Sequence, residues 1–135
     1  DEVMRGGGWV TGIIPKLLVE WEVEHRAISE LIVCDDMHQR KLMIYSKADA
    51  ALILPGGFGT LDEFYEILTL VQTAKIHKVP IVCVGAYFWE TLNNHIHHGL
   101  MLPAGTIDDA DTGLYTITDD EETIMEIARS AQARK

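Results

Sequence analysis

Basic residues are scarce in this sequence. Its 135 residues include 11 Lys and Arg against 21 Asp and Glu, so the formal net charge is −10. Proteins that bind nucleic acid rely on basic patches that neutralise phosphate groups. The charge balance therefore argues against a nucleic-acid partner. It does not exclude a small anionic ligand, because such a site needs only a few local donors.

Long apolar runs and cysteines are also few. No apolar run reaches the roughly 18 residues that a membrane span needs, and the charged start, residues 1–5, is unlike a signal peptide. The two cysteines, Cys34 and Cys83, lie far apart in apolar runs, which indicates reduced core residues and no disulfide framework. These features predict a cytoplasmic protein with no membrane partner.

Short apolar runs alternate with helical stretches along the chain. A length of 135 residues suggests one domain, 1–135. Alternating strands and helices are typical of βαβ units, and continuously apolar strands indicate a parallel sheet that is buried on both faces. We therefore predict an α/β, Rossmann-like three-layer fold with a parallel sheet. The predicted strands are 9–14, 31–34, 50–54, 81–84 and 114–117; the predicted helices are 37–47, 61–74, 87–100 and 119 or 120 to about 131; residues 16–30 are predicted as loop and irregular helix.

A glycine-rich loop, Pro55-Gly56-Gly57-Phe58-Gly59-Thr60, follows the third predicted strand. Ligands of open parallel sheets bind beyond the carboxyl ends of the strands. Glycines let the backbone approach an anion closely and adopt positive φ, and the following helix start presents free N–H groups. The loop is neither a Walker A motif nor a full dinucleotide fingerprint. It predicts a phosphate site, with a tight turn that needs glycine only for geometry as the alternative.

Two further features have both a structural and a functional interpretation. Thr60-Leu61-Asp62-Glu63 fits a capping box, yet Glu63 could instead face a ligand as an acid, a base or a cation stabiliser. Arg40 and Lys41 fall in the first turns of a helix that Asp35 or Asp36 can cap. Cations are unfavourable there unless an anion is bound, so these two residues are either solvated surface charges or anion ligands.

Together these residues resemble the LOG family, the cytokinin riboside 5′-monophosphate phosphoribohydrolases. The resemblance is carried by residues 37–41, Met-His-Gln-Arg-Lys, and residues 55–63, Pro-Gly-Gly-Phe-Gly-Thr-Leu-Asp-Glu, and it extends over about 7–102. Either motif alone would be weak, whereas the pair at this separation is specific. Proteins similar to this family were long labelled lysine decarboxylases, but no lysine here lies in a recognisable cofactor-binding context.

The resemblance implies hydrolysis of the N-glycosidic bond of a purine nucleoside 5′-monophosphate, which yields free base and ribose 5-phosphate. It implies Arg40 and Glu63 as the catalytic pair, no cofactor, and homodimers. A carboxylate could stabilise the oxocarbenium-like centre or activate water, and Arg40 could hold phosphate or a ribose oxygen, or polarise the leaving base. The implied substrate-binding residues are Glu22, Met37, Lys41, Gly56, Gly57, Phe58, Gly59, Thr60 and Thr69.

The sequence departs from the family at its beginning, where family members carry a further βαβ segment with a second glycine-rich loop. The chain also lacks an initiator Met and opens in what resembles a helix end, so we expect it to begin inside a larger unit. This departure keeps two alternatives open: a nucleotide-binding module that does no chemistry, and a structural subunit that pairs with a complete homologue. The spacing of His95, His97 and His98 does not place three ligands on one helix face, so no metal site is predicted.

Overall fold

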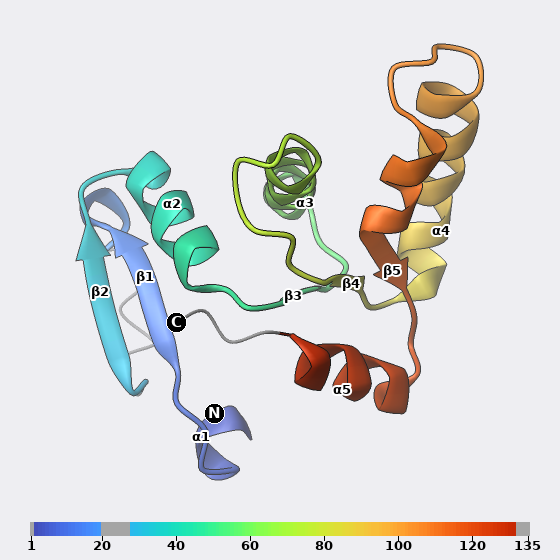
Figure 1. Ribbon diagram of the computed structural model, residues 1–135. Coiled ribbons are helices and arrows are strands. Elements are labelled where there is room, and N and C mark those ends of the chain that lie inside the picture. The colour runs from blue at the N-terminus through green and yellow to red at the C-terminus, as the bar shows by residue number, and fades with distance from the viewer. Residues whose placement is uncertain (1, 20–27, 132–135) are drawn as a thin grey trace. The chain divides into compact units, whose positions relative to one another are not determined.

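A computed structural model describes residues 2–19 and 28–131 of the chain. The contacts between residues divide it into two compact units, residues 1–47 and residues 48–135 (Figure 1). Within the ranges that the structure describes, no helix combines the length and the apolar character that a bilayer crossing requires. The two units are taken in turn below.

The first unit is a pair of parallel strands followed by a helix. Strand β1 (Thr11–Pro15) pairs with β2 (Glu30–Cys34), so that Pro15 lies opposite Cys34 at the carboxyl edge. A short helix, α1 (Glu2–Arg5), precedes them, and Gly7, with φ +80°, lies just beyond its end. A 3₁₀ turn, η1 (Lys16–Leu18), follows β1, and α2 (Met37–Lys47) follows β2.

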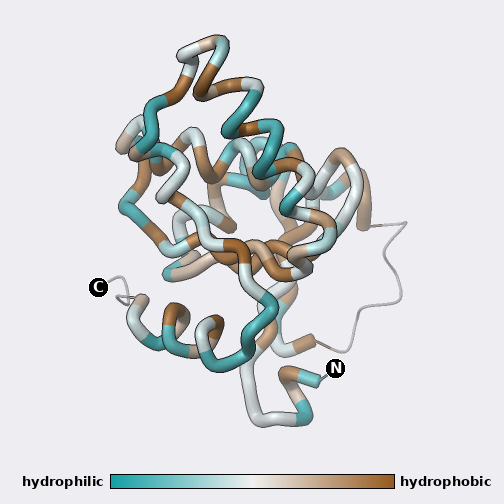
Figure 2. Tube along the Cα trace, turned by 90° about the vertical axis from the view of Figure 1, so that its right-hand side faces the viewer, coloured by the Kyte–Doolittle hydropathy of each residue, from teal (hydrophilic) through white to brown (hydrophobic). Residues whose placement is uncertain are grey.

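The second unit is a three-stranded parallel sheet in the order β3-β4-β5, with its helices on both faces. Helices α3 and α4 lie on one face of this sheet and α5 lies on the other (Figures 1 and 2). In chain order its elements are β3 (Ala51–Ile53), α3 (Phe58–Gln72), β4 (Ile81–Cys83), α4 (Ala86–His95), the π-helical η3 (Ile96–Met101), the 3₁₀ segment η4 (Asp109–Leu114), β5 (Tyr115–Ile117) and α5 (Glu121–Ser130).

The core of the second unit centres on β4, whose three residues are all buried. Figure 2 shows apolar residues along the strands between the helices. The ring of Phe64 on α3 lies 5.1 Å from that of Trp89 on α4 and 5.5 Å from that of Tyr115 on β5, measured between centroids. Burial raises the pKa of the Cys83 thiol to about 12, so this cysteine stays a protonated, unpaired core residue. The aromatic cluster ties both helices to the sheet and thereby fixes where they begin.

The predicted α/β class with parallel sheets is confirmed, and every predicted strand and helix is present; α2 has the predicted bounds, 37–47, and the ends of the others are shifted. The first strand begins at Thr11 instead of Trp9, whose side chain is 72% exposed. The helix predicted over 87–100 changes from α to π geometry at Ile96. The predicted reduced state of Cys34 and Cys83 is borne out, because both are free and buried. The single-domain organisation stays a prediction.

Candidate functional site

The start of α3 is open. The helix begins at Phe58, three residues before the predicted Leu61, and Gly57 is its N-cap residue with φ −89°. No side chain caps it, and the first intrahelical bond runs from the Leu61 N–H to the Gly57 carbonyl, 3.1 Å. The amides of Phe58, Gly59 and Thr60 precede that bond and have no intrahelical acceptor. The loop therefore presents three backbone donors at the positive end of the helix dipole.

The glycines of the loop are needed because they lack a side chain, and not because their backbone dihedral angles are unusual. We expected Gly56, Gly57 and Gly59 to adopt positive φ, and this is wrong: among the described glycines positive φ occurs at positions 7, 85 and 105. A β carbon on Gly56 would lie 2.1 Å from Oγ1 of Thr60, so the residue must lack one. A β carbon on Gly57 or Gly59 would meet nothing within 4 Å, so these two border open space.

The structure excludes one of the two interpretations of Thr60 and Glu63, the capping box. Thr60 lies inside the first turn of α3 and Gly57 takes the N-cap position, so the pattern falls three residues too late for capping. Glu63 is exposed in the second turn and is not used to cap the helix. The side chain of Phe58 is 92% exposed. Thr69 lies roughly 14 Å further along the helix than Thr60 at 1.5 Å per residue, and its role in a site stays a prediction.

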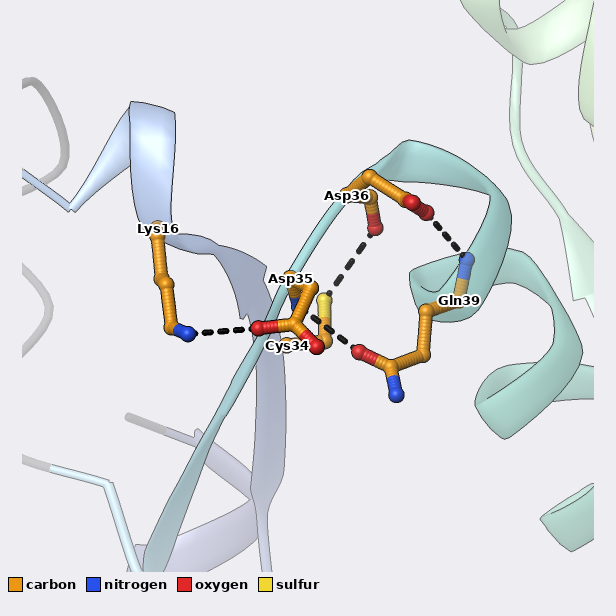
Figure 3. Close-up of polar contacts among 5 residues, drawn as sticks. All are labelled: Lys16, Cys34, Asp35, Asp36 and Gln39. Atoms are coloured by element: carbon orange, nitrogen blue, oxygen red, sulfur yellow. Dashed lines mark hydrogen bonds and ion pairs between the residues drawn. The ribbon is translucent and has the colours of Figure 1, made fainter.

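The start of α2 in the first unit is closed by its own carboxylate (Figure 3). Oδ1 of Asp36 accepts a hydrogen bond from the Gln39 N–H at 2.8 Å, and Oε1 of Gln39 accepts one from the Asp35 N–H at 2.6 Å. The predicted cap at Asp35 or Asp36 is thereby confirmed as Asp36. Nζ of Lys16 lies 2.5 Å from Oδ1 of Asp35, and this pairing raises the pKa of Lys16.

Arg40 and Lys41 lie in the second turn of α2, both half-buried, and Met37 lies in its first turn with 44% exposure. Nε of Arg40 is buried and has no hydrogen-bond partner among the described residues. Because buried guanidinium donors are normally paired, this atom favours a ligand for Arg40 over a purely structural role. Arg40 and Glu63 belong to different units, so their meeting stays a prediction. Glu22 lies outside the described residues.

Asp119 closes the start of α4, a role that the sequence did not reveal. We expected Asp119 or Asp120 to cap the last helix, and Asp120 does so by accepting the Thr123 N–H at 2.8 Å. Oδ1 of Asp119 instead accepts the N–H groups of Gly85, at 2.5 Å, and Ala86, at 3.2 Å. The available signal was that Asp119 and Gly85 both follow strands of one parallel sheet, whose carboxyl ends share an edge.

Described residues of the second unit line two hollows on opposite edges of its sheet. One, of about 450 Å³, shares Leu61 with the first turn of α3 and is otherwise lined by Tyr87, Phe88, Thr91, Leu92 and His95 of α4. A larger one, of about 670 Å³, lies at the amino ends of β4 and β5 and includes Pro80 and Leu114. The larger hollow is therefore at the opposite edge of the sheet from the glycine loop, and the smaller one borders the candidate site.

Of the three histidines near the end of α4, His95 lies beside the backbone of the following π-helical turn. A β carbon on Gly99 would lie 2.9 Å from Nδ1 of His95, so the imidazole lies against the backbone of η3. Across the ranges 2–19 and 28–131, no three His, Cys, Asp or Glu side chains gather as ligands of a metal ion would.

Comparisons with known proteins agree on one group of enzymes. A family model described as "possible lysine decarboxylase" matches residues 1–128. The chain is 44% identical over 79 residues to a cytokinin riboside 5′-monophosphate phosphoribohydrolase of Arabidopsis thaliana, which is 58% of this chain and 36% of the relative. It is 45% identical over 78 residues, 58% of this chain and 41% of the relative, to the protein so named in Mycobacterium tuberculosis. It is 34% identical over 109 residues to the protein so named in Rhodococcoides fascians, which is 77% of this chain and 55% of the relative. The chain thus spans about half or less of the length of these curated relatives.

Proposed function

Because this chain belongs to the LOG family, whose model carries the description "possible lysine decarboxylase", we propose that it acts in nucleotide hydrolysis. The reaction is cleavage of the N-glycosidic bond of a purine nucleoside 5′-monophosphate, of the adenine or cytokinin type, to free base and ribose 5-phosphate. The names of the relatives support this reaction, and none of the three compared above is named a decarboxylase. The chain covers about half or less of the length of those relatives, so the catalytic activity of this chain is itself part of what we propose.

The open start of α3 is the observation that carries the proposal. Three backbone amides and the positive end of a 15-residue helix face unfilled space beside Gly57 and Gly59. A 5′-phosphate matches this arrangement in charge and in its number of acceptors. Arg40, with its unpaired buried Nε, supplies a second group that suits an anion or a ribose oxygen.

Glu63 lies in the second turn of α3, three residues after Thr60, and its side chain is exposed. Cleavage of a glycosidic bond builds positive charge on the ribose, which an exposed carboxylate can stabilise, or the carboxylate can activate the attacking water. Arg40 can assist departure of the base by polarising it. The proposal assigns the two residues as a catalytic pair and leaves the division of these roles to experiment.

The proposal extends to the protein's assembly and setting. We expect a homodimer, from the resemblance to the family, and a cytoplasmic location, which the two free thiols Cys34 and Cys83 favour. No cofactor is required, because water, an acid–base group and charge stabilisation suffice for the reaction.

The direct test is incubation of the protein with AMP and, separately, with N6-isopentenyl-AMP. Free base is separated by chromatography and ribose 5-phosphate is measured in the same samples. We expect equal amounts of the two products from at least one substrate. When lysine is supplied instead, we expect no release of carbon dioxide. If neither nucleotide releases base, the hydrolase proposal is contradicted.

A nucleotide-binding module is the alternative, because the open start of α3 can hold a phosphate without any catalytic group. This alternative keeps the α3 phosphate site and removes the chemistry. It predicts that AMP raises the Tm of the protein, that no base appears, and that Glu63→Ala leaves the affinity for AMP nearly unchanged.

A further inference from the structure

The turn between β4 and α4 is held by a carboxylate from a distant part of the chain. Gly85 is buried and left-handed, with φ +99° and ψ 66°, a conformation that favours glycine. The two oxygens of Asp119 accept the N–H groups of Gly85 and Ala86 at 2.5 to 3.2 Å. Asp119 is itself placed by β5, because the Thr118 N–H donates to the Cys83 carbonyl at 3.1 Å.

The same turn supports the beginning of the glycine loop. A β carbon added to Gly85 would lie 2.5 Å from Cγ and 3.1 Å from Cδ of Pro55, so the Pro55 ring lies against the Gly85 backbone. Pro55 directly precedes Gly56 and Gly57, and the Val84 N–H donates to the Ile53 carbonyl at 3.0 Å just before the turn. Movement of the Gly85 turn would therefore be transmitted to the loop through a direct contact between backbone and ring.

We propose that Asp119 is a positioning residue for the phosphate-binding glycine loop. Its carboxylate holds the turn at Gly85 and Ala86, and the turn fixes Pro55 so that Gly57 and Gly59 face open space. The carboxylate also occupies the start of α4, so that a substrate phosphate at this edge of the β3-β4-β5 sheet is directed to α3. The proposal rests on the proposed function for the identity of the bound group, and on the contacts above for the positioning.

The first experiment needs no ligand. In ¹⁵N-labelled protein, the amide signals of Gly56, Gly57 and Gly59 are compared between wild type, Asp119→Ala and Asp119→Asn. We expect Asp119→Ala to shift them clearly and Asp119→Asn to shift them less, because an amide oxygen still accepts a hydrogen bond. If Asp119→Ala fails to fold, Asp119→Asn decides alone. Loop signals identical to those of wild type would overturn the proposal.

Asp120→Asn is the matched control. It makes the same change of charge at the next position, but the carboxylate of Asp120 caps α5 by accepting hydrogen bonds from Thr123 instead of binding the Gly85 turn. We expect it to leave the signals of Gly56, Gly57 and Gly59 unchanged. Equal shifts in the Asp119→Asn and Asp120→Asn proteins would indicate a general effect of charge and would contradict positioning by Asp119.

The second experiment measures the phosphate contribution by calorimetric titration with AMP and with adenosine. We expect Asp119→Ala to weaken AMP binding roughly tenfold, the loss of a charge-assisted contact network, while adenosine binding changes little. A general destabilisation would weaken both ligands alike and would overturn the proposal. If wild-type protein binds neither ligand, the proposed function fails, whereas the unliganded loop signals still decide the role of Asp119.

Discussion

Helices α3 and α4 begin at the same edge of one parallel sheet, yet their first turns are finished differently. The first amides of α4 are satisfied by the carboxylate of Asp119, which comes from beyond β5. The start of α3 has a glycine N-cap and no side-chain cap. In sequence, both helices follow a three-residue strand and a glycine. The difference arises because the fold brings the Asp119 carboxylate to the start of α4, whereas no side chain caps the start of α3.

The comparison teaches how an anion site is kept selective within one sheet edge. A helix start attracts negative charge wherever it is exposed, by about 0.3–1 kcal/mol for a surface charge. An internal carboxylate at α4 removes that attraction there, and the empty start of α3 keeps it. Asp36 at α2 and Asp120 at α5 also close helix starts with a carboxylate. Each accepts a hydrogen bond from the backbone N–H three residues further along the chain.

The largest expected effect compares one acid on each helix. Glu63 lies in the second turn of α3 and Glu90 in the second turn of α4. If the open start is the working one, Glu63→Gln lowers the rate of base release by between about a hundredfold and ten-thousandfold, as loss of an acid–base group does, and leaves AMP affinity nearly unchanged. Glu90→Gln is the control. Similar rates for both variants would break the comparison.

A second variant converts the start of α3 into one like that of α4. Gly57→Asp fits the space, because a β carbon there meets nothing within 4 Å, and its φ of −89° is accessible to any residue. The new carboxylate should cap the helix, stabilise the fold by a few tenths of a kcal/mol, and repel phosphate. We expect AMP affinity to fall by at least about a hundredfold, measured by titration calorimetry.

Gly57→Asn separates the effect of a side chain's volume at position 57 from the effect of its charge. It caps the helix with a neutral side chain of nearly the same size, so it should weaken AMP binding much less than Gly57→Asp. If both substitutions leave AMP affinity at the wild-type value, phosphate does not bind at the start of α3, and the two helix starts differ in structure alone.

The local pattern of the sequence was enough to predict the open loop and the closed start of α2. A glycine run after an apolar strand and an Asp just before a helix both act within a few residues, so the pattern carries the information. The sequence left a capping box at Thr60 and Glu63 open as an alternative, and the structure excludes it because the helix already begins at Phe58. Spacing identified a possible box but could not weigh it against this earlier start.

The role of Asp119 could not be predicted in the same way. Its partner Gly85 is 34 residues away, and only the pairing of β4 with β5 brings the two together. Sequence placed Asp119 beside the last helix, where Asp120 proved sufficient. The predicted pairing of Arg40 with Glu63 stays a prediction for a related reason: the two residues belong to different units, and proximity in sequence does not decide whether they meet.

Asp120 offers a smaller effect that sharpens the contrast between a cap and a positioning residue. Hydrogen bonds from the Thr123 side chain and backbone lower the pKa of Asp120. A lowered pKa in the folded state means that the carboxylate stabilises the fold above the usual Asp value near 3.8, and that this contribution is lost as the pH falls through the folded value.

We therefore expect Asp120→Ala to lower the Tm by a few degrees at pH 7, with AMP affinity unchanged, and the difference in Tm to shrink as the pH falls below the usual Asp value near 3.8 and through the lowered folded pKa. Thermal melts of both proteins across this range check it. A loss of AMP affinity as large as that of Asp119→Ala would remove the distinction between the two aspartates.

The smallest effect concerns the start of α2, where Lys16 pairs with Asp35 beside the Asp36 cap (Figure 3). Both partners are exposed, with side-chain exposures of 67% and 69%, and exposed ion pairs contribute little to stability.

Asp35 raises the pKa of Lys16, so any stabilisation is present below the usual lysine value near 10.5 and is lost as the pH rises through the higher folded value. Lys16→Met should accordingly change the Tm at pH 7 less than Asp36→Ala does, and its effect should disappear as the pH rises through the raised folded pKa of Lys16. A larger loss for Lys16→Met would mean that the ion pair, and not the carboxylate cap, closes this helix start, and α2 would then no longer belong with α4 in the comparison.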